Sequence, residues 1–274
     1  MTQHQILDAG EPVTGTQSVE RALSLLPLVA RGGDEGATLA VIVAASGLNK
    51  PTARRLLMAL IRARLVEQDP ASRRYCLGQE LYVLGTVAAR RHGLLEQAAE
   101  SLRRLSATTA DTSFVSARHG DYVLCLRREE GHHPVRTHAL QAGDQHPLGV
   151  GAGSLALLSA LPGPEREAAI DRLAPAYATY PGYSPAIVRD DVARALAEGY
   201  ALNPGRVVPS SWGIGLALRL PDGRVAGALS VAAIDSRLAP DRRAELVALL
   251  AEEVRAVEAR LARVFARVSG GSHD

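Results

Sequence analysis

Residues 50–62 have the spacing of a helix that is buried along one side. Five apolar residues fall at positions i, i+3, i+4, i+7 and i+8, namely Ala53, Leu56, Leu57, Leu60 and Ile61. At about 100° per residue they form one continuous stripe, while Arg55 and Arg62 lie on the opposite side. Because a stripe of this kind is stable only when neighbouring elements cover it, the helix belongs to a small packed domain.

The segments on either side supply such elements in the order of a winged helix-turn-helix. Helix caps, glycine turns and short apolar runs mark the boundaries. The expected elements are a helix from Ser18 to Gly32-Gly33, a helix over 39–45 capped by Thr38, a turn at Ser46-Gly47, the helix of residues 50–62, and strands at 65–68 and 74–77 joined by a hairpin tip over 69–73.

The second half of the chain alternates between helical and strand-like patterns. A helix expected over 79–91 is broken by Gly93 and connects the two halves. Such a mixture favours an α+β domain over a strict parallel sheet. Strands are expected at 113–118, 122–128, 135–140, 213–220 and 225–234, and further helices at 94–107, 154–161, 164–173, 185–198 and 240–268.

The basic residues are unevenly distributed. The 274-residue chain holds 31 basic and 29 acidic residues, a net charge of +2. Residues 50–74 contain seven basic and two acidic residues, whereas residues 93–274 contain 20 basic and 21 acidic ones. This asymmetry indicates a polyanionic partner for the first region.

Double-stranded DNA is the partner that the motif and its charge favour together. The second helix of a helix-turn-helix enters the major groove by its N-terminal end, and basic side chains on a wing contact the backbone or the minor groove. Taken singly, each arginine is better explained as a solvated surface residue; taken together, the set favours DNA binding. The candidate DNA-binding residues are Ser46, Asn49, Lys50, Pro51, Thr52, Arg54, Arg55, Arg73 and Arg74.

Short motifs along most of the chain point to one known family. They are Ser18-Val19-Glu20-Arg21-Ala22-Leu23, the stretch from Ser46 to Leu57, Arg74-Tyr75-Cys76-Leu77-Gly78, Gly151-Ala152-Gly153, Glu198-Gly199-Tyr200-Ala201 and Gly227-Ala228-Leu229-Ser230-Val231. The second is close to the signature GLPKSTVxRLL and the third matches YxLG. Over roughly residues 17–265 the chain resembles the IclR-type bacterial transcriptional regulators.

The resemblance implies a fold and a set of partners. The fold would be α+β, with a flexible tail over 1–16, a winged helix-turn-helix over 17–78, a linker helix over 79–92, a GAF-like α/β effector-binding domain over 93–268 and a tail over 269–274. The partners would be double-stranded promoter DNA, a small organic acid and further copies of the chain in a homodimer or homotetramer. This chain departs from the family at Ser154, where many members have lysine, and at residues 203–209, which are often richer in acids.

The glycine-rich segment 149–154 has three interpretations. It is a poor dinucleotide fingerprint, because the glycine spacing is wrong. It can hold a carboxylate at a helix N-terminus, or its glycines can simply allow close packing. The resemblance favours the carboxylate and places effector-binding positions at Gly151, Ala152, Asn203, Gly213 and Ser230, with Trp212 as a candidate pocket wall or lid. For Ser230, a satisfied strand hydroxyl is an almost equal alternative.

Other classes of function have weaker support. Cys76 and Cys125 form no metal or disulfide pattern, and His132, His133, His138 and His146 lack ligand spacing. No catalytic motif, cofactor site, signal peptide or membrane span is recognised. We therefore expect a cytoplasmic, ligand-responsive transcriptional regulator, a repressor or dual regulator of a small-molecule catabolic operon. The alternatives are a metabolic enzyme with an accessory winged helix and a winged helix used only for protein contacts.

Overall fold

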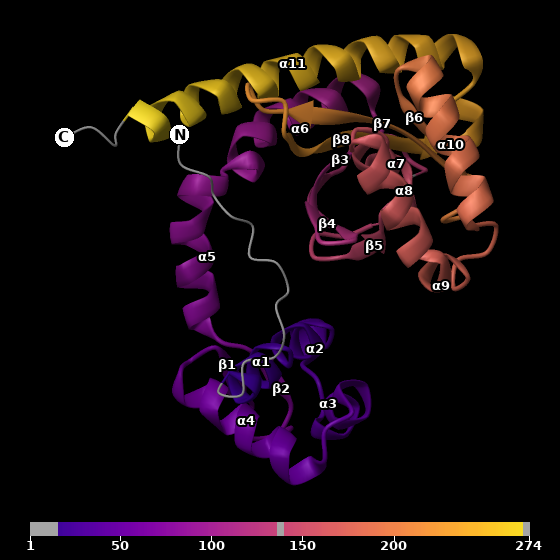
Figure 1. Ribbon diagram of the computed structural model, residues 1–274. Coiled ribbons are helices and arrows are strands. Elements are labelled where there is room, and N and C mark those ends of the chain that lie inside the picture. The colour runs from indigo at the N-terminus through magenta and orange to yellow at the C-terminus, as the bar shows by residue number, and fades with distance from the viewer. Residues whose placement is uncertain (1–15, 136–139, 271–274) are drawn as a thin grey trace. The chain divides into compact units, whose positions relative to one another are not determined.

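The computed structural model describes residues 16–135 and 140–270, and the chain divides into two compact units at the His92–Gly93 bond (Figure 1). The predicted tails at 1–16 and 269–274 fall almost wholly outside the described residues. The first unit contains α1 (Gln17–Leu23), α2 (Leu26–Ala30), the 3-10 helix η1 (Gly33–Glu35), α3 (Leu39–Ser46), α4 (Lys50–Arg62), β1 (Val66–Gln68), β2 (Tyr75–Leu77) and α5 (Gln79–His92).

The core of the first unit forms around α4, as its apolar stripe predicts. Four stripe residues are buried, and Ile61 packs against the same core at partial exposure. The residues that cover the stripe come from the flanking elements and include Leu25, Val29, Ile42, Val66 and Tyr75. β1 and β2 pair antiparallel, which confirms the hairpin.

The helix expected to begin at Ser18 differs from the prediction at its start and in its interior. Thr16 occupies the N-cap position instead, and the helix is interrupted between α1 and α2. Pro27, in the first turn of α2, explains the interruption. Proline has no N–H to donate to the carbonyl of Leu23, and its ring clashes with that carbonyl in a continuous helix.

The second unit contains one six-stranded antiparallel sheet in the order β5-β4-β3-β8-β7-β6. Its elements are α6 (Leu94–Thr109), β3 (Thr112–His119), β4 (Tyr122–Glu129), β5 (Gln145–Pro147), α7 (Ala152–Ser159), α8 (Gly163–Arg172), α9 (Ala174–Tyr177), α10 (Pro185–Glu198), β6 (Ala201–Pro204), β7 (Ser211–Arg219), β8 (Val225–Ile234), the 3-10 helix η2 (Asp235–Arg237) and α11 (Pro240–Gly270).

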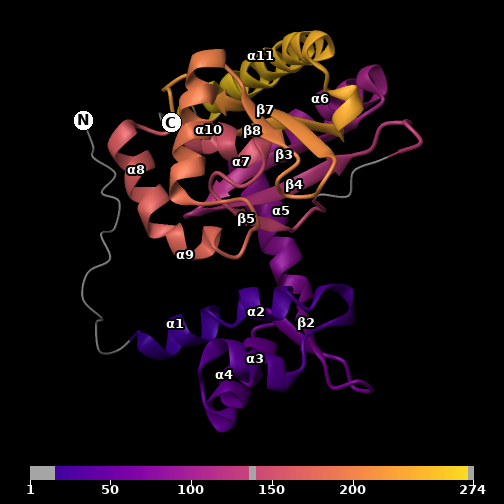
Figure 2. The ribbon, with the colours of Figure 1, turned by 90° about the vertical axis from the view of Figure 1, so that its right-hand side faces the viewer.

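Helices cover both faces of this sheet (Figure 2). Helices α6 and α11 pack on one face through an apolar cluster that includes Leu102, Val231 and Leu250. Helices α7 to α10 cover the other face through a second cluster, which includes Leu157 and Val188. The α+β class is therefore confirmed. In the described parts of the chain, no helix combines the length and apolarity needed to cross a bilayer.

Two short strands differ from the prediction. β5 and β6 lie at the two edges of the sheet and were not expected from the sequence. The strand expected over 135–140 falls largely outside the described residues, and its described ends, Val135 and Leu140, are not in strands.

Candidate functional site

The outer face of α4 is the basic surface of the first unit. Lys50, Pro51, Arg54 and Arg55 are exposed, and together with Met58 and Arg62 they border one shallow hollow. Thr52 is partly buried at the flank of this face. Four of the nine predicted DNA-binding residues thus lie side by side on one helix.

Two other predicted residues shape the turn before α4. The Asn49 side chain accepts a hydrogen bond from the backbone N–H of Thr52 at 2.9 Å, so Asn49 is the N-cap of α4. The Ser46 hydroxyl accepts from the N–H of Leu48 and donates to the carbonyl of Val43. Gly47, at φ 67°, adopts the left-handed conformation that ends α3. Both polar side chains therefore hold the start of α4 in place.

The wing positions its two arginines differently. Asp69 accepts hydrogen bonds from the N–H and the hydroxyl of Ser72, and these bonds lower the pKa of Asp69. Arg73, exposed at the hairpin tip, has φ 60°. Arg74 is partly buried and donates from Nη1 to the carbonyl of Gly36 at 2.9 Å. Arg73 is thus available to a partner, whereas Arg74 also ties the wing to the segment before α3.

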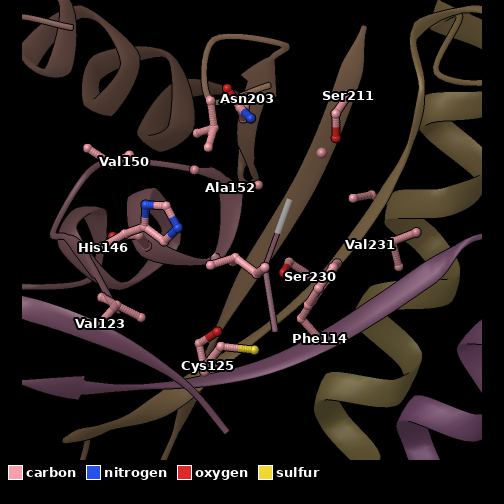
Figure 3. Close-up of a pocket in the computed structure, with 18 of the residues that line it drawn as sticks. Phe114, Val123, Cys125, His146, Val150, Ala152, Asn203, Ser211, Ser230 and Val231 are labelled. Atoms are coloured by element: carbon pink, nitrogen blue, oxygen red, sulfur yellow. The ribbon is translucent and has the colours of Figure 1, made fainter. Parts of the chain in front are cut away.

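A pocket in the second unit lies between the sheet and the N-terminal end of α7 (Figure 3). Its lining includes all six predicted effector-binding positions, Gly151, Ala152, Asn203, Trp212, Gly213 and Ser230. Sequence reasoning missed other lining residues, among them Phe114, Ser116, Val123, Cys125, His146, Val150 and Val207. Phe114, Ser116, Val123 and Cys125 lie on β3 and β4, where alternation along a strand is their only sequence signal, whereas Val150 and Val207 lie in loops and His146 lies on the unexpected strand β5.

Small residues on β7 let α7 approach the sheet closely. A Cβ atom added to Gly215 would lie 2.6 Å from the carbonyl oxygen of Ala152 and 3.0 Å from the nitrogen of Gly153. A Cβ added to Gly213 would meet the Cβ of Ala152 at 3.3 Å. The first turn of α7, whose N–H groups have no carbonyl acceptors within the helix, is therefore seated directly at the pocket.

The hydroxyl groups at the pocket are not equivalent. Ser154 accepts from the N–H of Gly149 at 3.0 Å and donates to the carbonyl of Pro147 at 2.9 Å, so it holds the glycine-rich segment in place. Ser116 and Ser230 are 4% and 7% exposed, and neither hydroxyl has a hydrogen-bond partner among the described residues. A Cβ on Gly153 would lie 3.2 Å from the hydroxyl oxygen of Ser230.

An amide and two titratable groups complete the polar lining. The Asn203 side-chain oxygen accepts from the N–H of Arg206 at 3.2 Å. Burial raises the pKa of the Cys125 thiol to about 11 and lowers the pKa of His146. The thiol is accordingly protonated at neutral pH, and the imidazole is neutral.

The other candidate histidines lie elsewhere. His132 and His133 are in the loop after β4, and His138 falls outside the described residues. Within the described part of the chain, no three His, Cys, Asp or Glu side chains are grouped closely enough to hold a metal ion.

Comparison with known proteins bears on both units. The model of the IclR helix-turn-helix domain matches residues 18–70, and that of the bacterial transcriptional regulator IclR C-terminal domain matches residues 86–259. The HTH-type transcriptional regulator BhcR of Paracoccus denitrificans is 28% identical over 233 residues, which cover 83% of this chain and 81% of that relative. The relatives are regulators, which argues against an enzyme with an accessory winged helix.

Solved structures have the same fold. The IclR transcriptional regulator from Alicyclobacillus acidocaldarius superposes with a TM-score of 0.76 at 25% identity, covering 92% of this chain and all of that one. An IclR homologue from Microbacterium hydrocarbonoxydans, complexed with 4-hydroxybenzoate, gives a TM-score of 0.72 at 22% identity, covering 89% of this chain and 98% of that one. With matched models over both units, this chain belongs to the IclR family of DNA-binding transcriptional regulators.

Proposed function

We propose that the protein binds operator DNA through the outer face of α4 and the wing, and that a small organic acid in the α7 pocket changes this binding. The operon would be a catabolic one, controlled by repression or by dual regulation. Lys50 and Arg55 would reach base edges and phosphates in the major groove, while Arg73 would contact the backbone beside it.

The unpaired hydroxyls of Ser116 and Ser230 are the observation that carries the ligand proposal. A hydroxyl that lines a pocket and has no partner within the protein is available to hydrogen-bond a ligand there. Here the two hydroxyls line a pocket together with the first turn of α7, where backbone N–H groups and the helix dipole favour an anion. A carboxylate would satisfy both sets of donors, and Phe114, Val123 and Val150 would surround its apolar part. The 4-hydroxybenzoate complex of a structural relative supports an organic acid as the ligand.

The exposed apolar surface of α5 favours association between copies of the protein. Four large apolar side chains are exposed on this helix, Tyr82, Val83, Leu84 and Val87, with exposed fractions between 45% and 77%. Exposed apolar surface of this kind is typical of protein interfaces. We therefore propose a homodimer or homotetramer, which sedimentation equilibrium would test.

Two measurements test the proposed function. A thermal-shift screen of pyruvate, glyoxylate and 4-hydroxybenzoate should show stabilisation by at least one acid, because a ligand of the folded state raises its stability. Footprinting of the promoter regions beside its own gene should show a protected site that the same acid alters. Absence of any protected sequence at low salt would contradict the DNA-binding proposal. A reporter driven by that promoter would separate repression from activation.

A further inference from the structure

The proposed ligand pocket has no permanent cation in its lining. None of the lining residues within the described ranges is lysine or arginine. Apart from His146, the polar groups there are serine hydroxyls, the Asn203 amide, the Cys125 thiol, the Trp212 indole and the backbone at the start of α7, none of which carries a full positive charge. His146 is the lining side chain that can become positively charged by binding a proton. Without it, the carboxylate of an organic acid would be balanced only by neutral donors and the partial positive charge at the start of α7, and a partly buried ion without an opposite full charge is costly.

His146 is placed to meet such a ligand. It lies on β5, opposite Val123 of β4, and in Figure 3 its ring lies between Val123 and Val150 and points toward the cavity. Its Nδ1 atom is buried without a hydrogen-bond partner among the described residues. The ring contacts that of Tyr180, at 5.6 Å between centroids, and among the described residues no carboxylate forms an ion pair with the imidazole.

The groups that surround His146 keep it neutral in the empty pocket. Burial lowers its pKa, and Asp144, in the turn before β5, opposes that effect more weakly. Cys125 on β4 and the tyrosines Tyr180 and Tyr183 have pKa values raised by burial, so all three are uncharged at neutral pH. A carboxylate placed beside the ring would therefore be the largest new influence on its protonation.

Building on the proposed function, we infer that His146 takes up a proton from solvent when an organic acid enters the pocket, and that the imidazolium formed there neutralises the carboxylate. Binding is then linked to pH. Affinity for the acid rises as the pH falls through the pKa of the occupied state, by up to about tenfold per pH unit. It levels off below the lowered pKa of the empty state, where His146 is already protonated. A neutral amide of the same shape gains nothing from the proton.

Calorimetric titration tests the inference on the intact protein. Pyruvate and 4-hydroxybenzoate are titrated at pH 7 in two buffers of different ionisation enthalpy, because the difference in heat gives the number of protons taken up. Their carboxyl groups are already ionised at this pH, so the ligand supplies none of the change. We expect uptake of up to one proton per acid bound, and none on binding of pyruvamide or 4-hydroxybenzamide.

Substitution assigns the proton to a residue. His146→Gln should abolish the uptake, flatten the pH dependence between pH 6 and 8 and weaken acid binding at least tenfold at pH 6. The matched control is His119→Gln, at the exposed end of β3, which should keep the wild-type uptake and affinity. Because uptake is measured first on the wild-type protein, the test does not depend on the folding of a variant.

The outcomes separate the inference from the function on which it rests. Binding of an acid without proton uptake, or uptake that persists in His146→Gln, would overturn the inference and leave the acid pocket standing. If neither acid binds at any pH between 6 and 8, the acid-sensing proposal fails and the role of His146 fails with it.

Discussion

Two serines beside the same pocket differ in their hydrogen bonds. Ser154 has its acceptor and its donor partner within the glycine-rich segment, whereas the Ser230 hydroxyl has none in the described part of the chain. A satisfied buried hydroxyl contributes to stability, while an unsatisfied one that borders a cavity is available to a ligand. The same residue type therefore has a structural role at one position and a proposed binding role at the other.

Alanine substitutions should separate these roles. Ser154→Ala leaves the N–H of Gly149 without its acceptor and should destabilise the protein by about 1–3 kcal/mol. Ser230→Ala removes no internal hydrogen bond, so the unfolding midpoint should stay near the wild-type value. Its acid affinity should fall by about 1.5–3 kcal/mol, the usual value of a hydrogen bond to a charged group. Thermal unfolding and acid titration of both variants provide the check; equal effects of the two substitutions on stability would contradict this assignment.

The sequence pattern and the family resemblance indicate some of the side chains at each candidate site, but not how each is used. Asn49 is one of the predicted DNA-binding residues, and the structure shows its side-chain oxygen capping α4. His146 was considered only as a metal ligand, because nothing in its neighbours along the chain indicates that β5 pairs with β4. Whether a hydrogen bond forms depends on the positions of the donor and acceptor atoms to within about an ångström. The spacing of residues in a sequence does not define atomic positions so finely.

At the scale of elements, the sequence patterns located the long helices and strands well. α10 and β8 have the predicted limits, and α11, predicted over 240–268, has an apolar stripe that is buried from Leu246 to Leu261. These elements are long enough for the periodicity to repeat. β5 and β6 contain three and four residues, too few to show an alternation, and they form because longer strands already present free edges to them.

The close packing of α7 on β7 depends on Gly215, which has no side chain. Gly215→Ala would place a Cβ in contact with the backbone of Ala152 and Gly153, and backbone cannot rotate away as a flexible side chain can. We expect a loss of about 1–3 kcal/mol in stability, together with weaker acid binding as the first turn of α7 moves. The measurements are thermal unfolding and acid titration.

Gly163 offers the matched control in the same unit. It is the first residue of α8, and a Cβ there would meet only the Arg166 guanidinium, at 3.9 Å. Gly163→Ala should leave stability unchanged or raise it by up to about 1 kcal/mol, since alanine loses less conformational freedom on folding. A Gly215→Ala protein as stable as this control would show that the close approach of α7 is not required.

α4 and the wing should contribute differently to DNA binding. Arg55→Ala removes a side chain at the end of α4 that we propose enters the major groove, so it should cost about 1–3 kcal/mol on the operator, with relaxed specificity. Arg73→Ala removes the proposed contact with the DNA backbone, so it should weaken binding to all sequences and reduce the slope of log K against log salt by about one. Fluorescence anisotropy with operator and scrambled duplexes over a salt series measures both effects. A larger loss of specificity in Arg73→Ala than in Arg55→Ala would reverse the assignment.

For the whole molecule, the net charge of +2 combines two surfaces with different partners. The basic excess of residues 50–74 serves the proposed contact with DNA, and the nearly neutral residues 93–274 contain a pocket with no fixed cation in its described lining. An acid that binds in the pocket of the second unit does not occupy the proposed DNA-binding face of the first unit. The two ligands can then influence each other only through the equilibrium between states of the protein.

This separation of sites leads to a quantitative prediction. If saturating acid changes the operator Kd by some factor, within the usual range of about 5–150, saturating operator must change the acid Kd by the same factor. Anisotropy gives the first quantity. Fluorescence of Trp212, the sole tryptophan and a residue of the pocket wall, gives the second. The Ser230→Ala protein should need a higher acid concentration for saturation. The factor by which saturating acid changes the operator Kd should stay the same, because the substitution lowers the affinity for the acid and leaves the equilibrium between states of the protein unaltered. Unequal factors in the wild-type protein would mean that the acid also binds outside this pocket, and direct competition at α4 would then explain its effect on DNA.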